Sequence, residues 1–469
     1  MFIKPKPCLP ILCSKGEREV CLQQDHDQYQ RNTIGFRGDE KGNHNQGSQQ
    51  DNCIELERQT VEFPPELLFC RVIHYSYITS MIKVLDVSGH ITGTMDALDN
   101  AIIRSGADAY LVYASSEDAD MRYLSGFTTS DPFIYFKKPG RRGVIIVSQM
   151  EHARAVREST AAVMTRAQAG LVEILKTEKD PWRATSKMIA GQVQGRILVP
   201  PRFPLALARA LQDSSELMVD HSALESMRAV KTRPQIAAIK NVQRVTESAI
   251  DLGISLIRKS TERNGILLSG GKPLTSERVK AAMHTCLIEH GCIAKDSIVS
   301  CGEDAAIPHC LGSGALKAYQ PIVLDIFPRH EQSGYFSDMT RTISKGKPDA
   351  KVRDMHAVVC EAQALAIGQV REGVAGSAIH QTVVDFFRDH GYGNTTTGFV
   401  HNLGHGIGLE VHEPPSLGPS GTSLIAGNVI TIEPGLYYPG VGGVRLEDIG
   451  LVTKKGFTRF TNYPMDLVV

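Results

Sequence analysis

Residues 403–413 read LGHGIGLEVHE, which places two histidines among closely spaced glycines. Four other segments in the last third of the chain each carry carboxylates: 322–326 (IVLDI), 335–342 (YFSDMTRT), 430–435 (ITIEPG) and 444–450 (VRLEDIG). Together the five segments offer side chains of the kinds that bind divalent cations: Asp325, Asp338, His405, Glu433 and Glu447. Four carboxylates and one imidazole suit a pair of hard to borderline cations that hold a water between them.

Three of these carboxylates lie in or beside apolar, strand-like segments. Asp325 follows the apolar residues 322–324, Glu433 follows residues 429–432, and Glu447 is placed in the same way. A carboxylate in such a segment must be paired, hydrogen-bonded or metal-bound, because burying an unpartnered charge is costly. The pattern therefore predicts a dinuclear metallohydrolase.

A dinuclear centre would cleave an amide bond without a Ser or Cys nucleophile. Two cations about 3.5–4 Å apart lower the pKa of a bridging water until hydroxide is available near neutral pH, and they also polarise the scissile carbonyl. Glu433 is the candidate for the carboxylate that relays the proton to the leaving amine, because it could contact both metal and water.

In their sequences and their order, these segments resemble those of the metallopeptidase family that includes aminopeptidase P, proline dipeptidase, methionine aminopeptidase and creatinase. The catalytic domain of this family has the pita-bread fold. The resemblance extends from about Met95 to the C-terminus, and the combination of DMTRT, GHGIGLEVHE, EPG and RLED is highly specific. It implies that the five side chains named above are the metal ligands, with Asp338 and Glu447 bridging both ions.

The resemblance also assigns four residues outside the ligand set. His309, His401 and His412 match positions that support the centre or contact the substrate, and Arg445 matches an arginine that supports the site in proline-specific members. We expect His309 and His412 to hold the substrate and its tetrahedral intermediate by hydrogen bonds. His401 lies four positions before His405, so a helical turn would place both on one face. The alternative is a partly buried His401 with a backbone partner.

The segment between Asp325 and Asp338 is slightly enlarged relative to the commonest spacing in the family. Pro328 and Gly334 predict a hairpin turn there, and turn length can vary while both flanking strands are kept. Both aspartates therefore remain candidate ligands. Residues 329–331 are expected to project near the mouth of the site and to affect substrate specificity.

Several functions compete within the family. The N-terminal domain disfavours a methionine aminopeptidase, and the complete ligand set disfavours creatinase and a non-catalytic pita-bread binding protein. We therefore expect an Xaa-Pro aminopeptidase acting on peptide substrates with Pro at the second position, with an Xaa-Pro dipeptidase (prolidase) as the alternative. The oxygen-rich ligands favour two Mn²⁺ ions, and Co, Zn and Fe stay open. The resemblance also implies a homodimer.

The predicted fold class is α/β (α+β), in two domains. A small creatinase-type N-terminal α/β domain is expected at residues 95–225, where helix-like and strand-like segments alternate, and a pita-bread catalytic domain at residues 226–469. Residues 1–94 form an extension that is either a genuine tail or a start-site artefact. Its polar residues 23–51 predict disorder, and a chain starting at Met95 should fold and bind metal.

Charge and hydropathy disfavour other classes of protein. The 51 Lys and Arg residues balance 51 Asp and Glu residues, so the chain lacks the basic excess that displaces counterions from nucleic acid. No apolar run reaches the roughly eighteen residues of a membrane span, and Pro7 and Pro10 break the N-terminal apolar stretch, unlike a signal peptide. Ten cysteines without a C-x-x-C pair favour free thiols and a cytoplasmic location.

Overall fold

Two groups of strands, each with its own helices, make up the part of the chain that the structure describes. The computed structural model describes residues 96–393 and 396–469. The extension predicted for residues 1–94 lies outside this part. Among the described helices, none combines the length and the apolar character that crossing a membrane requires.

The first group of strands forms a six-stranded sheet with order β4-β3-β2-β1-β5-β6. The elements of this part are β1 (Ala109–Ala114), β2 (Phe133–Lys137), β3 (Val144–Val147), β4 (Ala162–Thr165), β5 (Gly195–Val199), β6 (Ser215–Val219), α3 (Ala97–Ser105), α4 (Ala119–Ser125), α5 (His152–Glu158), α6 (Leu171–Thr177), α7 (Pro181–Ala190), α8 (Leu205–Leu211) and α9 (Ala223–Ala229). The β1–β2 and β2–β3 pairs are antiparallel, and the other three pairs are parallel.

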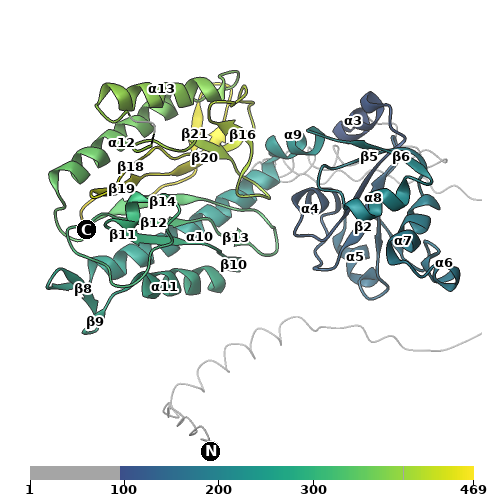
Figure 1. Cartoon of the computed structure of the whole chain (residues 1–469), viewed down its shortest axis with the longest axis horizontal. Coiled ribbons are helices and arrows are strands. Elements are labelled where there is room, and N and C mark those ends of the chain that lie inside the picture. The colour runs from purple at the N-terminus through teal and green to yellow at the C-terminus, as the bar shows by residue number, and fades with distance from the viewer. Residues whose placement is uncertain (1–95, 394–395) are drawn as a thin grey trace, which may run out of the picture. The chain divides into compact units, whose positions relative to one another are not determined.

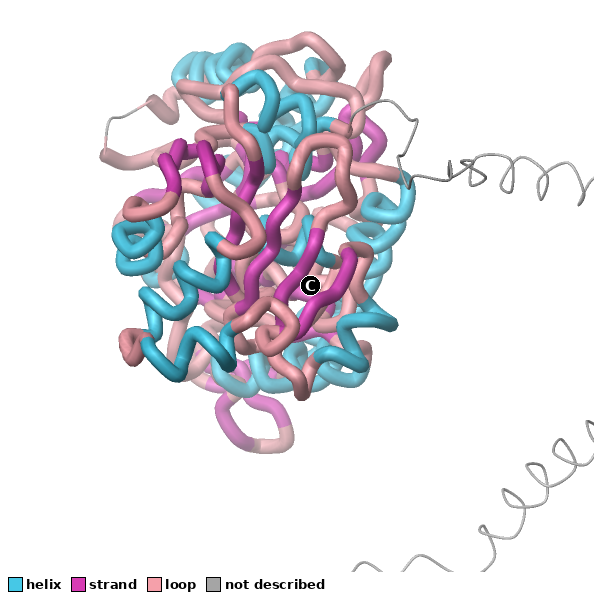
Figure 2. Tube along the Cα trace, turned by 90° about the vertical axis from the view of Figure 1, so that its right-hand side faces the viewer, coloured by secondary structure: helices cyan, strands magenta, loops and turns pink. Residues whose placement is uncertain are grey.

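Both faces of this sheet are buried under helices, as Figure 2 shows for the magenta strands and the cyan helices beside them. Side chains alternate between the two faces along a strand. In β1, Tyr110 and Val112 belong to one core cluster, whereas Ala109 and Leu111 belong to the other. Because helices cover both faces of the sheet, the strands are apolar on both faces. This agrees with the small α/β domain that the sequence predicts.

The long helix α10 (Arg233–Arg258) begins the second part. Thr232 and Gln235 form a capping box at its start, in which each side chain bonds the backbone of the other residue. Pro234 lies in the first turn, where a backbone N–H would have no partner within the helix. The helix is amphipathic, with its buried residues recurring at helical spacing.

Helices α10 and α11 lie on one side of the second group of strands, and α12 and α13 lie on the other (Figure 1). The elements of this part are α11 (Ser276–Glu289), α12 (Ala350–Gln369), α13 (Gly376–Asp389), the 3-10 turn η2 (Asp304–Ala306), β7 (Thr261–Arg263), β8 (Ile266–Ser269), β9 (Lys272–Pro273), β10 (Cys292–Ile293), β11 (Ile298–Cys301), β12 (Ile322–Ile326), β13 (Arg329–His330), β14 (Met339–Ile343), β15 (Gly404–Gly406), β16 (Glu413–Leu417), β17 (Val429–Ile432), β18 (Gly435–Tyr438), β19 (Gly442–Arg445), β20 (Asp448–Val452) and β21 (Phe457–Arg459).

Three antiparallel sheets carry the candidate ligands. Their orders are β11-β12-β14, β16-β15-β17-β20-β21 and β18-β19. One core cluster packs α10 and α11 against β11, β12 and β14, and a second packs α12 and α13 against β16 to β20. The ends of several strands are therefore held between two apolar layers, where a metal centre would be sheltered from water.

The enlarged segment between Asp325 and Asp338 is more than a hairpin turn. Its strand β13 pairs with β10, while Arg329 also forms a bridge with Phe336. The guanidinium of Arg329 donates to both carboxylate oxygens of Glu117, at 2.8 and 3.2 Å. Residues 329–331 do not line the cavity that holds the candidate ligands. That they project near its mouth stays a prediction, and the contacts with β10 and Glu117 fix where the segment lies.

Glycine permits strand β15 to approach its neighbours closely. A Cβ atom at Gly404 would overlap the backbone carbonyl oxygen of Thr431, and one at Gly406 would overlap that of Pro414. These two glycines flank His405. The close approach thus sets how far the imidazole stands from the carboxylate of Glu433, directly after β17.

We predict that Gly404→Ala destabilises the protein by about 1–3 kcal/mol or more, because a backbone atom cannot yield to the new methyl group as a flexible side chain could. The control is Gly368→Ala on α12, where nothing lies within 4 Å of the new Cβ. That change should be neutral or stabilise by up to about 1 kcal/mol through helix propensity. Urea unfolding followed by circular dichroism measures both, and equal midpoints for the two variants would contradict the prediction.

Candidate metal centre

The five candidate ligands come from strand ends that the antiparallel sheets bring together. Asp325 lies in β12 opposite Thr340, and Asp338 directly precedes β14. The other three lie as follows: His405 in β15, Glu433 directly after β17, and Glu447 between β19 and β20. Segments separated by more than a hundred residues thus contribute to one site.

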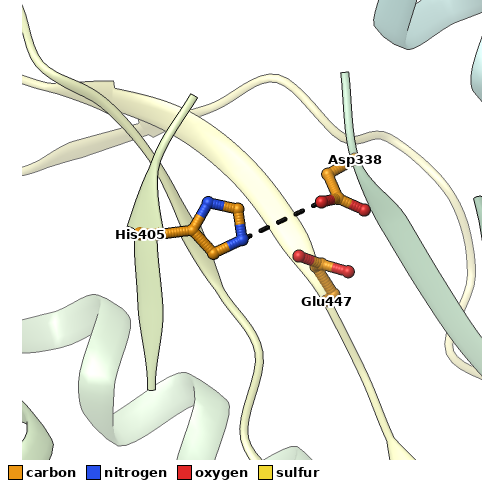
Figure 3. A group of neighbouring side chains, drawn as sticks. All are labelled: Asp338, His405 and Glu447. Atoms are coloured by element: carbon orange, nitrogen blue, oxygen red, sulfur yellow. Dashed lines mark ion pairs between the residues drawn. The ribbon is translucent and has the colours of Figure 1, made fainter. Parts of the chain in front are cut away.

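Three of these side chains point toward one another, as Figure 3 shows. One ligand atom from each of Asp338, His405 and Glu447 lies within 4.8 Å of the other two. The Nε2 atom of His405 is 3.9 Å from Oδ2 of Asp338 and 3.3 Å from Oε1 of Glu433. Asp325 lines the same cavity. The structure therefore places all five candidate ligands around one space.

Crowding of these carboxylates changes their protonation. Burial raises the pKa of Asp338 and of Glu447, and the neighbouring carboxylates add to both increases. Burial also opposes ionisation of Glu433, but hydrogen bonding and the charge of His405 outweigh it and lower the pKa of Glu433 to about 2. Burial disfavours the His405 imidazolium, yet Glu433 raises the pKa of His405 to about 9. The protons that Asp338, Glu447 and His405 retain thus offset negative charge that bound divalent cations would offset in their place.

The residues present fit a pair of divalent cations. Among the described residues, Oδ1 of Asp325 and Oε1 of Glu447 are buried without a hydrogen-bond partner. The second oxygen of each carboxylate is held: Arg445 donates to Oδ2 of Asp325 at 2.5 Å, and Thr340 donates to Oε2 of Glu447 at 2.8 Å. Each carboxylate is therefore fixed by one oxygen and leaves the other for a cation, which is the usual way in which outer groups orient metal ligands.

Arg445 is the centre of a hydrogen-bond network behind the carboxylates. Besides Asp325, its guanidinium donates to the hydroxyls of Tyr437 (2.7 Å) and Thr340 (3.2 Å) and to the carbonyl oxygen of Pro308 (3.3 Å). It therefore ties the β12 carboxylate to the backbone beside the predicted substrate-binding His309. Arginine suits this role because its planar guanidinium offers several fixed donors.

Thr340 and Tyr437 are functional candidates that sequence reasoning missed. Thr340 lies two residues after Asp338 in a strand, so the alternation of side chains could have placed both on one face. Tyr437 lies in the apolar sequence GLYY of β18 and carries no charge that would have singled it out. Burial raises the pKa of Tyr437 to about 12, so its hydroxyl stays protonated and can donate a hydrogen bond.

The three predicted histidines all line the cavity, but they are held differently. His401 lies 2.9 Å from the Tyr437 hydroxyl through Nε2, and its Nδ1 lies 2.7 Å from the carbonyl oxygen of Asn402. The helical turn considered for His401 and His405 is wrong, because His405 lies in strand β15 and His401 in the loop before it. His412 packs edge-on against His405, with ring centroids 4.3 Å apart. Among these histidines, His309 and His412 are exposed toward the cavity.

The cavity itself has a volume of about 1030 Å³, enough for a short peptide. Its wall combines the carboxylates and histidines with apolar side chains from four loops and strands, among them Ile298, Leu311, Phe327 and Val411. Such a mixture of apolar wall and few fixed polar groups is typical of sites for small ligands.

Comparisons with known proteins place the chain in a family. Residues 237–454 match the family model of metallopeptidase family M24, and residues 95–230 match that of the creatinase/prolidase N-terminal domain. Together these matches cover well over half of the chain. The chain belongs to the M24 metallopeptidases with a creatinase/prolidase N-terminal domain, as the sequence predicts.

Individual relatives and solved structures are similar to this chain. An Xaa-Pro dipeptidase of Lactobacillus helveticus is 35% identical over 254 residues, which cover 53% of this chain and 64% of the relative. The solved prolidase from Pyrococcus furiosus has a TM-score of 0.66 at 24% identity, over 78% of this chain and 99% of that one. An X-Pro aminopeptidase from Thermotoga maritima has a TM-score of 0.66 at 26% identity, over 78% and 98% of the two chains. These similarities confirm the predicted fold.

We predict that added Mn²⁺ raises the melting temperature of the metal-free protein, because a ligand that binds only the native state stabilises it by mass action. The variant Asp338→Asn should lose most of this rise. Without metal it should be at least as stable as the wild type, since one buried acidic group has been replaced by a neutral amide. Differential scanning calorimetry with and without EDTA tests both statements. An Asp338→Asn protein that gains as much stability from Mn²⁺ as the wild type would contradict them.

Proposed function

We propose that the chain hydrolyses the peptide bond before proline in Xaa-Pro dipeptides, as a dinuclear metallopeptidase. The supporting observation is that Asp325, Asp338, His405, Glu433 and Glu447 surround one cavity, with two buried carboxylate oxygens left unpartnered among the described residues. Bound divalent cations supply a nucleophilic water near neutral pH and polarise the scissile carbonyl.

The chain's own residues would do the rest of the work. Glu433 is the carboxylate that takes the proton of the attacking water and returns it to the leaving proline nitrogen. His309 and His412 line the cavity, and they would hold the substrate carbonyl and the charge that develops on its oxygen. His401 and Arg445 both contact the Tyr437 hydroxyl, and Arg445 also holds the carboxylate of Asp325.

The choice between dipeptides and longer peptides rests on the relatives. The sequence alone favours an Xaa-Pro aminopeptidase, with the dipeptidase as the alternative. The named relatives fit the dipeptidase better, because the curated one is called an Xaa-Pro dipeptidase and the solved one a prolidase. The aminopeptidase stays as the second candidate because the Thermotoga maritima protein with the same fold is called an X-Pro aminopeptidase.

Further properties belong to the same proposal. Mn²⁺ is the metal proposed first, because carboxylate oxygens outnumber nitrogen ligands four to one in the candidate set. We also propose a homodimer, a cytoplasmic location, and a division between an N-terminal domain at residues 95–225 and a catalytic domain at residues 226–469.

The first test compares substrates. Leu-Pro should be cleaved with a kcat/KM at least about tenfold above that of the tripeptide Leu-Pro-Gly, a difference of about 1.4 kcal/mol in the barrier. Glu447→Gln is the matched inactive control. Faster cleavage of the tripeptide would favour the aminopeptidase, and cleavage of Met-Ala without cleavage of either proline peptide would overturn the proposal.

The second test concerns His412. Replacing it with alanine should lower kcat by about 10²–10³, the usual loss when one donor to a developing oxyanion is removed, while KM changes less. His390→Ala is a suitable control, because His390 is exposed at the end of α13 and bonds only its own helix among the described residues. Steady-state kinetics on Leu-Pro measures both variants. An unchanged kcat for His412→Ala would show that His412 does not stabilise the developing oxyanion.

A further inference from the structure

Gln363 is a buried side chain of α12 that no step of the proposed reaction uses. It is 1% exposed. Its Nε2 atom donates hydrogen bonds to the backbone carbonyl oxygens of Ile432 at 3.1 Å and Leu446 at 3.2 Å. These carbonyls belong to the peptide groups directly before Glu433 and Glu447. One amide therefore contacts the backbone of two candidate ligands.

The residue before β15 and strand β14 hold the opposite ends of the same two peptide groups. The N–H of Glu433 donates to the carbonyl oxygen of Leu403 at 2.8 Å, and the N–H of Glu447 donates to that of Thr340 at 3.1 Å. Together with the bonds from Gln363, both ends of each peptide group are fixed. The Cα atoms that carry the two carboxylates can then shift only if these bonds break.

The surroundings of Gln363 make its amide expensive to bury without partners. On the same helix, Val359, Ala362 and Ala366 are fully buried in the apolar cluster that packs α12 against the strands. Carbonyl oxygens only accept hydrogen bonds, so the amide nitrogen must face them. A buried amide in an apolar layer destabilises the fold unless its hydrogen bonds form. The helix and the two strand ends are thus held at one separation.

We propose that Gln363 is a positioning residue that sets the separation of the Glu433 and Glu447 carboxylates, and through it the affinity of the site for divalent cations. This inference rests on the metal centre of the proposed function. The residue that sets the geometry of the metal centre then lies on helix α12, which is beside strands β18 and β19 in Figure 1. Groups that orient metal ligands from outside typically change metal affinity about 10–100-fold when they are removed.

The test replaces Gln363 with methionine, which has a similar length and no donor. Titration of the metal-free full-length protein with Mn²⁺ alone, followed by isothermal calorimetry, should show binding at least about tenfold weaker than in the wild type. At saturating Mn²⁺, kcat on Leu-Pro should also fall while KM changes little. Binding equal to that of the wild type would overturn the proposal.

Two controls separate positioning from general stability. Val359→Ala removes apolar volume from the same buried face without touching either carbonyl, and Gln369→Met changes an amide of the same helix whose Oε1 accepts only from Thr382 among the described residues. Both should keep the Mn²⁺ affinity of the wild type. If Val359→Ala weakens binding as much as Gln363→Met, the effect comes from stability and the proposal fails.

A second variant covers a Gln363→Met protein that does not fold. Gln363→Asn keeps the amide on a shorter stem that cannot reach both carbonyls, and the same weakening is expected. The titration also separates this proposal from the proposed function. Weaker Mn²⁺ binding supports it even if the wild type cleaves no Xaa-Pro peptide, a result that overturns only the proposed function. A wild type that binds neither Mn²⁺, Co²⁺ nor Zn²⁺ overturns both.

Discussion

Mutual repulsion among buried carboxylates is the constraint that governs the second part of this protein. Asp338 and Glu447 are almost fully buried, and burial raises the pKa of both. The charge of Asp325 adds to the increase at Asp338, and the charge of Asp338 adds to the increase at Glu447. Such a cluster persists in a folded chain only if protons, cations or fixed donors compensate it. Thr340 and Arg445 are donors of this kind, and the glycines of β15 bring His405 close enough to act as another.

Sequence reasoning found the charged part of this arrangement because charged residues in apolar strands are conspicuous. The five candidate ligands and the three histidines all line one cavity. Helix bounds are also predictable where the apolar period is clear: residues 205–211 (LALARAL) have apolar residues at helical spacing, and they form α8. At these positions the residue types that the local sequence pattern favours are also those that the tertiary structure requires.

The rest of the site depends on contacts between residues far apart in the sequence, which no local pattern predicts. Tyr437 and Gln363 are neutral residues whose importance comes from a distant partner, and nothing in their neighbours distinguishes them from ordinary strand or helix residues. For Thr340, only the strand alternation after Asp338 gave a signal. The pairing of β13 with β10 is likewise a tertiary choice, since the turn residues Pro328 and Gly334 are compatible with a simple hairpin. The proposed substrate is a dipeptide and not a longer peptide because of the names of the relatives, not because of the geometry of the site.

The spread of the candidate ligands along the chain has a consequence for folding kinetics. Asp325 and Glu447 lie at opposite ends of a stretch that includes α12, α13 and strands β13 to β19. Contacts of such long sequence separation form late, because closing the intervening chain costs entropy before any contact repays it. Full cation affinity can therefore arise only after both apolar layers have assembled. Capture of a cation by these residues would thus follow the assembly of both apolar layers instead of nucleating it.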